Sequence, residues 1–216
     1  MFKQYFKQAI HALRENRLTS VVSILGAMLS VAMILVVVLQ FQIKLVGYSP
    51  VSKRDRMLYI YSVNTKSKDG SENNNTGLSA ETIRECLYTL KKPEAVTVTA
   101  QNSHVISIPG KRLFEEYTVY YTDPAFWKVF DFKFLSGKPF TEADFNSGLP
   151  HVVISDMLAG ILFGTQDVVG RDILVNNVMP CTIAGVVKRP SKAASEAFAD
   201  VWMPYTCLLY TSDAAD

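Results

Sequence analysis

The sequence predicts an α+β extracytoplasmic domain of mixed strands and short helices, expected in two subdomains, preceded by a single N-terminal transmembrane α-helix. Two observations support this fold class. A long uncharged run near the N-terminus is apolar enough to cross a bilayer. The core domain beyond it, residues 44–206, combines strand-like runs and capped helical turns without regular alternation, which is typical of α+β domains.

The uncharged run extends from Leu18 to Ile43, between Arg17 and Lys44. As a helix it reaches roughly 39 Å, against ~30 Å for the hydrocarbon core of a bilayer. We therefore expect residues 18–43 to form the transmembrane helix. A cleaved signal peptide is the alternative, but its apolar core is shorter, and no small-x-small cleavage site follows this run. A buried helix of a soluble protein fits less well because such helices rarely lack charges over this length.

Residues 1–17 are expected to form a cytoplasmic amphipathic helix, because apolar residues recur at helical spacing among basic ones. A plain topogenic flank is the simpler alternative. Basic residues before a span hold that end of the chain in the cytoplasm. This positive-inside flank consists of Lys3, Lys7, Arg14 and Arg17. It predicts a cytoplasmic N-terminus and an extracytoplasmic main domain.

Small residues stand four apart within the span. Such spacing lets a second helix approach closely. The predicted helix-packing face consists of Ser23, Gly26, Ala27 and Ser30.

Beyond the span, runs rich in β-branched and aromatic residues predict strands, and Asn64 to Gly77 is expected to be a polar loop. The expected strands cover residues 57–63, 95–101, 104–108, 113–122, 132–137, 151–155, 171–176, 179–188 and 199–205.

Capping residues predict the helices between these strands. One is expected from Ser79 to a point before Pro93, and a short one after Asp123-Pro124. Another is expected from a capping box of Thr141 and Asp144, and a fourth from Ser155 to Gly164.

The last ten residues, 207–216, are expected to be a sequencing-adaptor artefact. CLLYTSDAAD back-translates into a sequence that resembles a transposase mosaic-end adaptor, and such scars are set aside before fold reasoning. The natural protein would then have been cut off near Thr206. A genuine polar tail is the alternative.

No enzyme or cofactor chemistry is expected. Beyond the span, with the last ten residues set aside, 18 basic residues stand against 17 acidic ones, and this balance offers no electrostatic footprint for nucleic acid. His11, His104 and His151 are far apart and lack metal-ligand spacing. Gly137-Lys138-Pro139 lacks the residues of a phosphate-binding loop.

The acidic residues and the cysteines do not define a functional site either. Asp123, Asp131, Glu115 and Glu116 could supply paired carboxylates, but no motif fixes them, and solvated strand or cap positions are the default. Cys86 and Cys181 are expected as buried free thiols, with a disulfide as the alternative.

Three segments resemble MacB/FtsX-type ABC transporter permeases. Residues 6–35 resemble the basic amphipathic helix and first membrane helix of that family. Residues 117–145 are similar to its run of aspartate, Phe-rich helix, leucine and Gly-x-Pro-Phe. Residues 151–190 match the VVIS, short helix, FG and GVV pattern of its extracytoplasmic core domain.

This resemblance implies a permease of the bacterial inner membrane with four membrane helices and a large periplasmic domain after the first. It implies a partner ATPase subunit or domain, a second permease copy, the lipid bilayer and a periplasmic adaptor as partners. ATP-driven motion would serve efflux, lipoprotein or peptide export, or regulation of a periplasmic partner. The alternative is a single-pass, membrane-anchored sensor or binding module.

Overall fold

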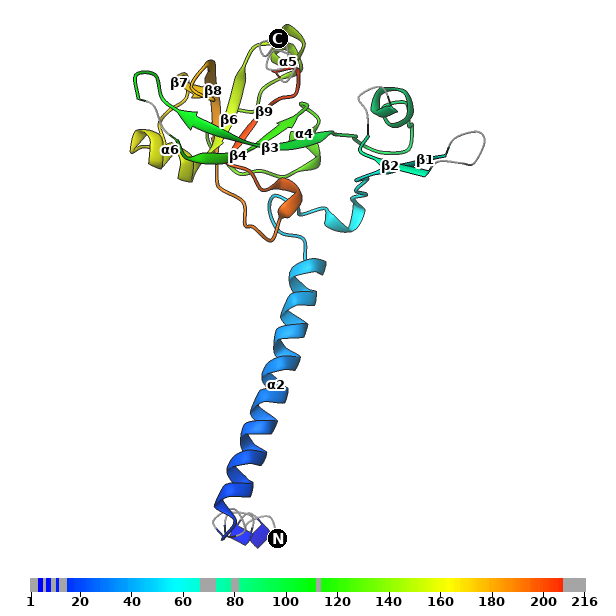
Figure 1. Cartoon of the computed structure of the whole chain (residues 1–216), viewed down its shortest axis with the longest axis vertical. Helices are drawn as coiled ribbons and strands as arrows, with labels where there is room; N and C mark the ends of the chain where they lie inside the picture. The colour runs from blue at the N-terminus through cyan, green and yellow to red at the C-terminus, as the bar shows by residue number, and fades with distance from the viewer. Residues whose placement is uncertain are drawn as a thin grey trace. The chain divides into compact units, whose positions relative to one another are not determined.

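The computed structural model describes residues 4–5, 7–8, 11, 15–66, 73–78, 82–111 and 114–207. The chain divides into two compact units, Met1–Val46 and Gly47–Asp216, which we describe separately. The first contains one long helix, α2 (Arg17–Leu45), drawn in blue in Figure 1.

The second unit, the outer domain, contains a two-stranded and a seven-stranded sheet with short helices, so the predicted α+β class is confirmed. Its strands are β1 (Val63–Lys66), β2 (Asn73–Thr76), β3 (Thr99–Ser107), β4 (Glu116–Thr122), β5 (Phe134–Gly137), β6 (His151–Ser155), β7 (Asp172–Val175), β8 (Met179–Val187) and β9 (Val201–Pro204). Its helices are η1 (Arg54–Arg56), η2 (Ile83–Leu87), α4 (Phe126–Val129), α5 (Glu142–Ser147), α6 (Asp156–Phe163) and η3 (Ser195–Ala197).

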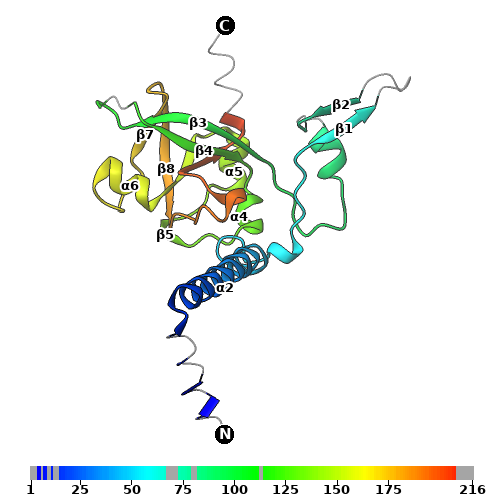
Figure 2. The ribbon, with the colours of Figure 1, turned by 60° about the horizontal axis from the view of Figure 1, so that its bottom comes forward.

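The larger sheet has the order β5-β8-β6-β9-β4-β3-β7, and β7 also pairs with β8. Six strands therefore form a closed ring, and β5 pairs with residues 185–187 of β8, beyond the residues of β8 that pair with β7. Two pairings, β4 with β9 and β6 with β8, are parallel, and the remaining pairs are antiparallel. Figure 2 shows α6 beside β8, which it contacts together with β6.

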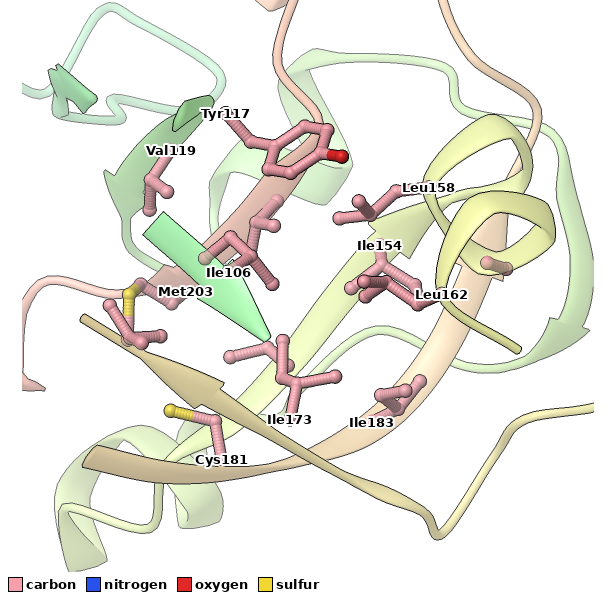
Figure 3. Packing of buried hydrophobic residues seen from close by; sticks show 14 of the residues in the cluster. Ile106, Tyr117, Val119, Ile154, Leu158, Leu162, Ile173, Cys181, Ile183 and Met203 are labelled. Atoms are coloured by element: carbon pink, nitrogen blue, oxygen red, sulfur yellow. The ribbon is translucent and has the colours of Figure 1, made fainter. Parts of the chain in front are cut away.

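Both faces of the central strands are buried, because alternate residues point to opposite sides. One face carries aliphatic side chains that converge under α6, as Figure 3 shows; we call this set the inner cluster. It includes Ile106, Val119, Val152, Ile154, Leu158, Leu162, Ile173, Cys181, Ile183, Val201 and Met203.

The opposite face is aromatic, and we call it the aromatic cluster. Trp202 is fully buried there, with its ring 5.1 Å from that of Phe132 and 6.3 Å from that of Trp127. The cluster is built from Val51, Tyr120, Phe126, Phe130, Phe140, Val153, Val187, Ala194, Ala197, Ala199 and Trp202, with partly buried rings around them.

Two of the capping predictions are confirmed, whereas α4 begins after Asp123-Pro124 with Ala125 rather than Asp123 as its N-cap. Thr141 and Asp144 form a reciprocal capping box at the start of α5. The hydroxyl of Ser155 accepts a hydrogen bond from the N–H of Leu158, and α6 ends at Gly164 with φ +70°. These local signals depend on a few neighbouring residues, which is why the sequence reveals them.

Some expected elements were wrong. Residues 57–62 are extended but unpaired within the described chain, so the strand begins only at Val63. The expected loop after it contains the β1–β2 hairpin. The strands expected over 95–101 and 104–108 are replaced by one continuous strand, β3, because β4 pairs along its length. The proposed cap Ser79 lies outside the described residues; the described helix is η2, and it ends before Pro93.

Candidate functional site

The first candidate site is the apolar helix α2. The most apolar 18-residue stretch of Arg17–Ile43 has a mean hydropathy of 2.8, and none of that stretch is buried inside the structure. Large apolar side chains are exposed on every side of it, including Leu18, Leu25, Leu29, Ile34, Val36 and Phe41. A helix that is apolar all round belongs in a membrane or a large protein core, and here no protein covers it.

The predicted packing face lies on one side of α2, since residues three, four and seven positions apart share a helix face. The hydroxyl of Ser30 donates to the carbonyl oxygen of Gly26 over 2.8 Å, so its polar group is satisfied within the helix. A Cβ added at Gly26 would meet no atom within 4 Å. Ser23 and Ala27 are also exposed. The face is available for a helix partner, and its use stays a prediction.

The basic flank is only partly described. Lys7 and Arg17 are helical and exposed, whereas Lys3 and Arg14 lie outside the described residues. The described positions agree with a helix before the span, but the topology stays a prediction.

A second candidate site is the segment that follows α2 in the sequence, residues 47–52, which we call the junction. Its contacts converge on Asp131, just after α4. The hydroxyl of Ser52 donates to Oδ2 of Asp131 over 2.8 Å, and that of Ser49 donates to its carbonyl oxygen over 2.7 Å. The N–H of Asp131 donates to the carbonyl oxygen of Pro50 over 2.9 Å.

Apolar burial and close packing hold the same segment. Val51 is fully buried in the aromatic cluster. A Cβ at Gly47 would collide with the backbone oxygen of Ser52 and lie 2.9 Å from its carbonyl carbon, so only glycine fits there without a shift. Arg54 then donates to the carbonyl oxygen of Ala193 over 3.3 Å. The junction is therefore fixed to the outer domain on several sides.

Two more of the acidic residues considered in the sequence, Asp123 and Glu115, have structural partners. Asp123, which is buried, accepts hydrogen bonds from the hydroxyls of Tyr88 and Thr97 at 2.7 and 2.6 Å and from the N–H of Phe126 at 3.1 Å. Glu115 accepts from the hydroxyl of Tyr117 over 2.8 Å. The structure pairs Asp123 with tyrosine and threonine hydroxyls, and it joins Asp131 to the junction.

His104 and His151 also lie in different places, and each contacts its own partners. His104 contacts the hydroxyl of Tyr121 over 2.8 Å and the side chain of Asn176 over 3.0 Å. Burial raises the pKa of Tyr121 to about 12, so it stays protonated at neutral pH. His151 lies 3.1 Å from Asp144. Within the described part of the chain, no three potential metal-ligating side chains gather.

Cysteine placement corrects one expectation. Cys181 is a buried free thiol, and burial raises its pKa to about 12. Cys86 is also free but exposed, because it lies on the outer side of the short helix η2 rather than in a core. Cys207 is buried in the inner cluster, and residues 208–216 lie outside the described chain. The adaptor origin of residues 207–216 stays a prediction.

One small cavity of about 240 Å³ lies between the β3–β4 and β7–β8 turns. It is lined by Ile108, Gly110, Lys111, Leu174 and Asn177. Ligand sites are usually larger, at about 300–1,000 Å³, and place several polar groups around the ligand. Among the described residues that line it, Lys111 alone is charged, and this lining identifies no substrate.

The sequence profile of the MacB-like periplasmic core domain matches residues 20–215, which include most of α2 and the whole described outer domain. The chain belongs to the MacB-like periplasmic core domain family.

Two relatives of this MacB-like chain are named as export ATP-binding/permease proteins. A "Probable export ATP-binding/permease protein" of Pseudomonas fluorescens is 27% identical over 217 residues, covering 95% of this chain and 31% of the relative. The "Macrolide export ATP-binding/permease protein MacB" of Pasteurella multocida is 28% identical over 92 residues, covering 43% of this chain and 14% of the relative. The chain therefore spans about a third or less of the length of these relatives.

A solved structure supports the MacB-like fold. The extracellular domain of the noncanonic ABC-type transporter YknZ from Gram-positive bacteria superposes with a TM-score of 0.50 and 23% identity. The match covers 63% of this chain and 67% of that domain. At this identity the likeness shows the fold alone.

The junction is the part of this MacB-like chain that sequence reasoning missed. Asp131 was considered only as a member of a carboxylate pair, and Ser49 and Ser52 were not singled out. A usable signal did exist, since Asp131 directly follows the Phe-rich helix of the family-like run 117–145. Its partner lies 79 positions away, and single-sequence patterns do not reveal such a distance.

Proposed function

We propose that this chain is the membrane-spanning permease part of an ABC transporter. It would couple ATP hydrolysis in a partner ATPase subunit or domain to motion of the outer domain, for efflux or for lipoprotein or peptide export. The observation that carries the proposal is the family match over residues 20–215, which joins an apolar helix to a MacB-like domain. The names of the relatives, which are export ATP-binding/permease proteins, support the same class.

The junction gives this proposal a physical basis. Close-packed interiors shift between discrete arrangements rather than deforming gradually. Because Val51 is part of the aromatic cluster and Asp131 holds Ser49, Pro50 and Ser52, a displacement of the junction would carry α4 and that cluster with it. Motion of the membrane helices would in this way reach the outer domain.

The proposed setting is the bacterial inner membrane, with a cytoplasmic N-terminus and a periplasmic domain. Lys7 and Arg17 support this orientation through the positive-inside rule. The proposed partners are the ATPase, a second permease copy that packs on the small-residue face of α2, and a periplasmic adaptor. We propose no nucleic-acid partner.

Topology is tested in bacterial membranes by an alkaline carbonate wash and an amine reagent that does not cross the membrane. The chain should stay in the membrane pellet. In spheroplasts, Lys111 and Lys192, which are exposed on the outer domain, should react, whereas Lys3 and Lys7 should not. Release by carbonate, or equal labelling of Lys7 and Lys111, would overturn the proposed topology.

The transporter class is tested by affinity purification of the chain from its native membrane. An ABC ATPase should co-purify with the chain. Replacing the phosphate-binding lysine of that ATPase should stop export while the complex stays assembled. A preparation without any ATPase that still binds a ligand through the outer domain would favour the anchored sensor instead.

A further inference from the structure

The ring of strands in the outer domain has a short seam between β3 and β7. The ladder of this seam consists of two residue pairs, whereas seven pairs join β3 to β4 on its other side. Just beyond the ladder, the N–H of Asn176 donates to the carbonyl oxygen of Val105 over 2.7 Å. The ring thus closes here through few backbone contacts, so a side-chain contact beside the seam contributes a large share of its stability.

The side chain of Asn176, in the β7–β8 turn, makes such a contact. Its backbone has a φ of +54°, a left-handed conformation that asparagine tolerates. Its Oδ1 accepts from the N–H of Val105 over 3.3 Å, and its Nδ2 lies 3.0 Å from Nδ1 of His104. The other ring nitrogen of His104, Nε2, lies 2.8 Å from the hydroxyl oxygen of Tyr121 on β4. We call His104, Tyr121 and Asn176 the histidine clasp.

The donors of the histidine clasp determine which ring nitrogen carries the proton. The backbone N–H of Val105 can only donate, so the amide atom of Asn176 that faces it has to be the oxygen. The amide nitrogen of Asn176 is then a donor, and Nδ1 of His104 accepts from it. A neutral imidazole with an accepting Nδ1 carries its proton on Nε2, which donates to the hydroxyl oxygen of Tyr121. Neutral His104 therefore satisfies every one of these contacts.

Protonation of His104 removes this complementarity. An imidazolium ring donates from both nitrogens, so its Nδ1–H would face the NH₂ group of Asn176. Turning the amide over would direct its oxygen to the ring, but it would also place the NH₂ group against the N–H of Val105. Two donors face each other in either arrangement, and one contact of the seam is lost.

The elements around His104 carry several other titratable groups. They are Lys111 in the β3–β4 turn, Glu115, Glu116, Tyr117 and Tyr121 in or next to β4, Asp172 in β7, and Cys181 and Cys207 beside Tyr121. Glu115 and Asp172 accept hydrogen bonds from hydroxyl groups over 2.8 Å. Burial raises the pKa values of both tyrosines and of Cys181 to about 12 and that of Cys207 to about 11. Because histidine ordinarily titrates between about pH 5 and pH 8, His104 is the member of this set that changes charge in that range.

We propose that the histidine clasp is a pH-sensitive fastening of the β3–β7 seam, closed while His104 is neutral and released when His104 gains a proton. After release, the seam opens more readily and the β7–β8 hairpin separates from β3. The inference concerns the outer domain alone, so it stands whether or not the chain belongs to an exporter.

Hydrogen exchange of the full chain in lipid nanodiscs tests the clasp at about pH 7.5 and about pH 5.5, near the two ends of the range in which histidine titrates. Rates are corrected for the intrinsic pH dependence of exchange. The peptide that covers β7 and Asn176 should lose protection by about 5- to 30-fold at the lower pH, because a hydrogen bond of the seam is lost. A peptide that covers β9 should keep its protection. Unchanged protection of β7, or an equal loss in β9, overturns the inference.

Substitutions test whether His104 causes the response. His104→Gln cannot gain a proton, so the pH response of the β7 peptide should disappear. His151→Gln is the matched control, because His151 contacts Asp144 rather than the seam, and it should keep the response. A response that survives in His104→Gln, or that is lost equally in His151→Gln, overturns the inference.

Asn176→Asp gives a test with the opposite sign. Aspartate also tolerates the left-handed backbone, and its second carboxylate oxygen would accept from the protonated ring of His104. The seam of this variant should be better protected at about pH 5.5 than at about pH 7.5. A response with the sign of the wild type overturns the inference.

Discussion

The hydroxyl of Ser52 donates a hydrogen bond to Oδ2 of Asp131 over 2.8 Å, although 79 positions separate the two residues. The backbone of Asp131 adds contacts to Ser49 and Pro50 at 2.7 and 2.9 Å. The segment that follows the apolar helix is thus fastened at one residue of the outer domain. Variants at this point test whether these contacts stabilise the outer domain.

Asp131→Ala should lower the free energy of unfolding by about 0.5–1.5 kcal/mol, because it removes the acceptor of Ser52 and leaves the backbone contacts in place. Thermal unfolding in detergent, followed by the fluorescence of Trp127 and Trp202, measures the change. Asp167→Ala is the matched control, since its carboxylate is exposed and its hydrogen bond to Thr165 is made by its backbone N–H rather than its side chain. Equal effects of the two variants would contradict a role for the junction.

Gly47→Ala should destabilise the outer domain by roughly 1–3 kcal/mol, because the new Cβ would collide with the backbone of Ser52. Gly160→Ala in α6 is the control. There a Cβ meets no atom within 4 Å, so the substitution should raise stability by about 0.5–1 kcal/mol through helix propensity. The same fluorescence assay should show a loss of stability for Gly47→Ala and a gain for Gly160→Ala. An unchanged stability of Gly47→Ala would show that the junction can shift to accept the new side chain.

Gly26→Leu should weaken association of α2 with a second helix by roughly 1 kcal/mol, about fivefold, because close approach depends on small side chains. A two-hybrid assay for membrane helices measures the association. Leu25→Phe adds bulk on the opposite side of α2 and should have little effect. If both variants weaken association equally, the small-residue face is not the interface.

Trp202→Ala should cost about 3–5 kcal/mol, because the ring is fully buried in the aromatic cluster and its removal leaves a cavity. Phe114→Ala, where the ring is 85% exposed, should change stability by less than about 0.5 kcal/mol. Denaturant unfolding followed by circular dichroism compares them. If the alanine variant does not fold, Trp202→Phe should show a smaller loss, and an unaffected Trp202→Phe midpoint would argue against tight packing.

The pKa of Asp144 is lowered, first by the hydrogen bond from the N–H of Thr141 and then by the Thr141 hydroxyl and His151. A carboxyl with a lower pKa in the folded state stabilises the fold above its ordinary value of 3.8, and this contribution is lost as the pH falls through the folded-state pKa. The difference in unfolding midpoint between the wild type and Asp144→Asn should therefore shrink below pH 3.8. A constant difference would contradict the linkage.

The sequence predicted the features that depend on neighbouring residues. The long apolar helix, the Thr141 capping box and the α6 helix from Ser155 to Gly164 follow from composition and from spacings of a few residues. The strands β7 and β8 likewise follow from two strand-like runs on either side of a short turn, and the structure pairs them. Each signal lies within one stretch of the chain.

The sequence did not predict which strands pair when they lie far apart in the chain. The parallel pairing of Tyr120 with Trp202 joins strands about 80 positions apart, and neither run records its partner. The merging of two expected strands into β3 depends on the length of β4. The polar β1–β2 hairpin has almost no apolar alternation to reveal it, and the contacts of Asp131 with the junction depend on the folded arrangement.

The double pairing of β7, with β3 on one side and β8 on the other, has a mechanical consequence. An open sheet subjected to a pull loses its strands one after another, starting from a free rim. Here each of six strands has two neighbours in the ring, so a force applied to one strand is shared among several ladders. The ring therefore resists the loss of single strands.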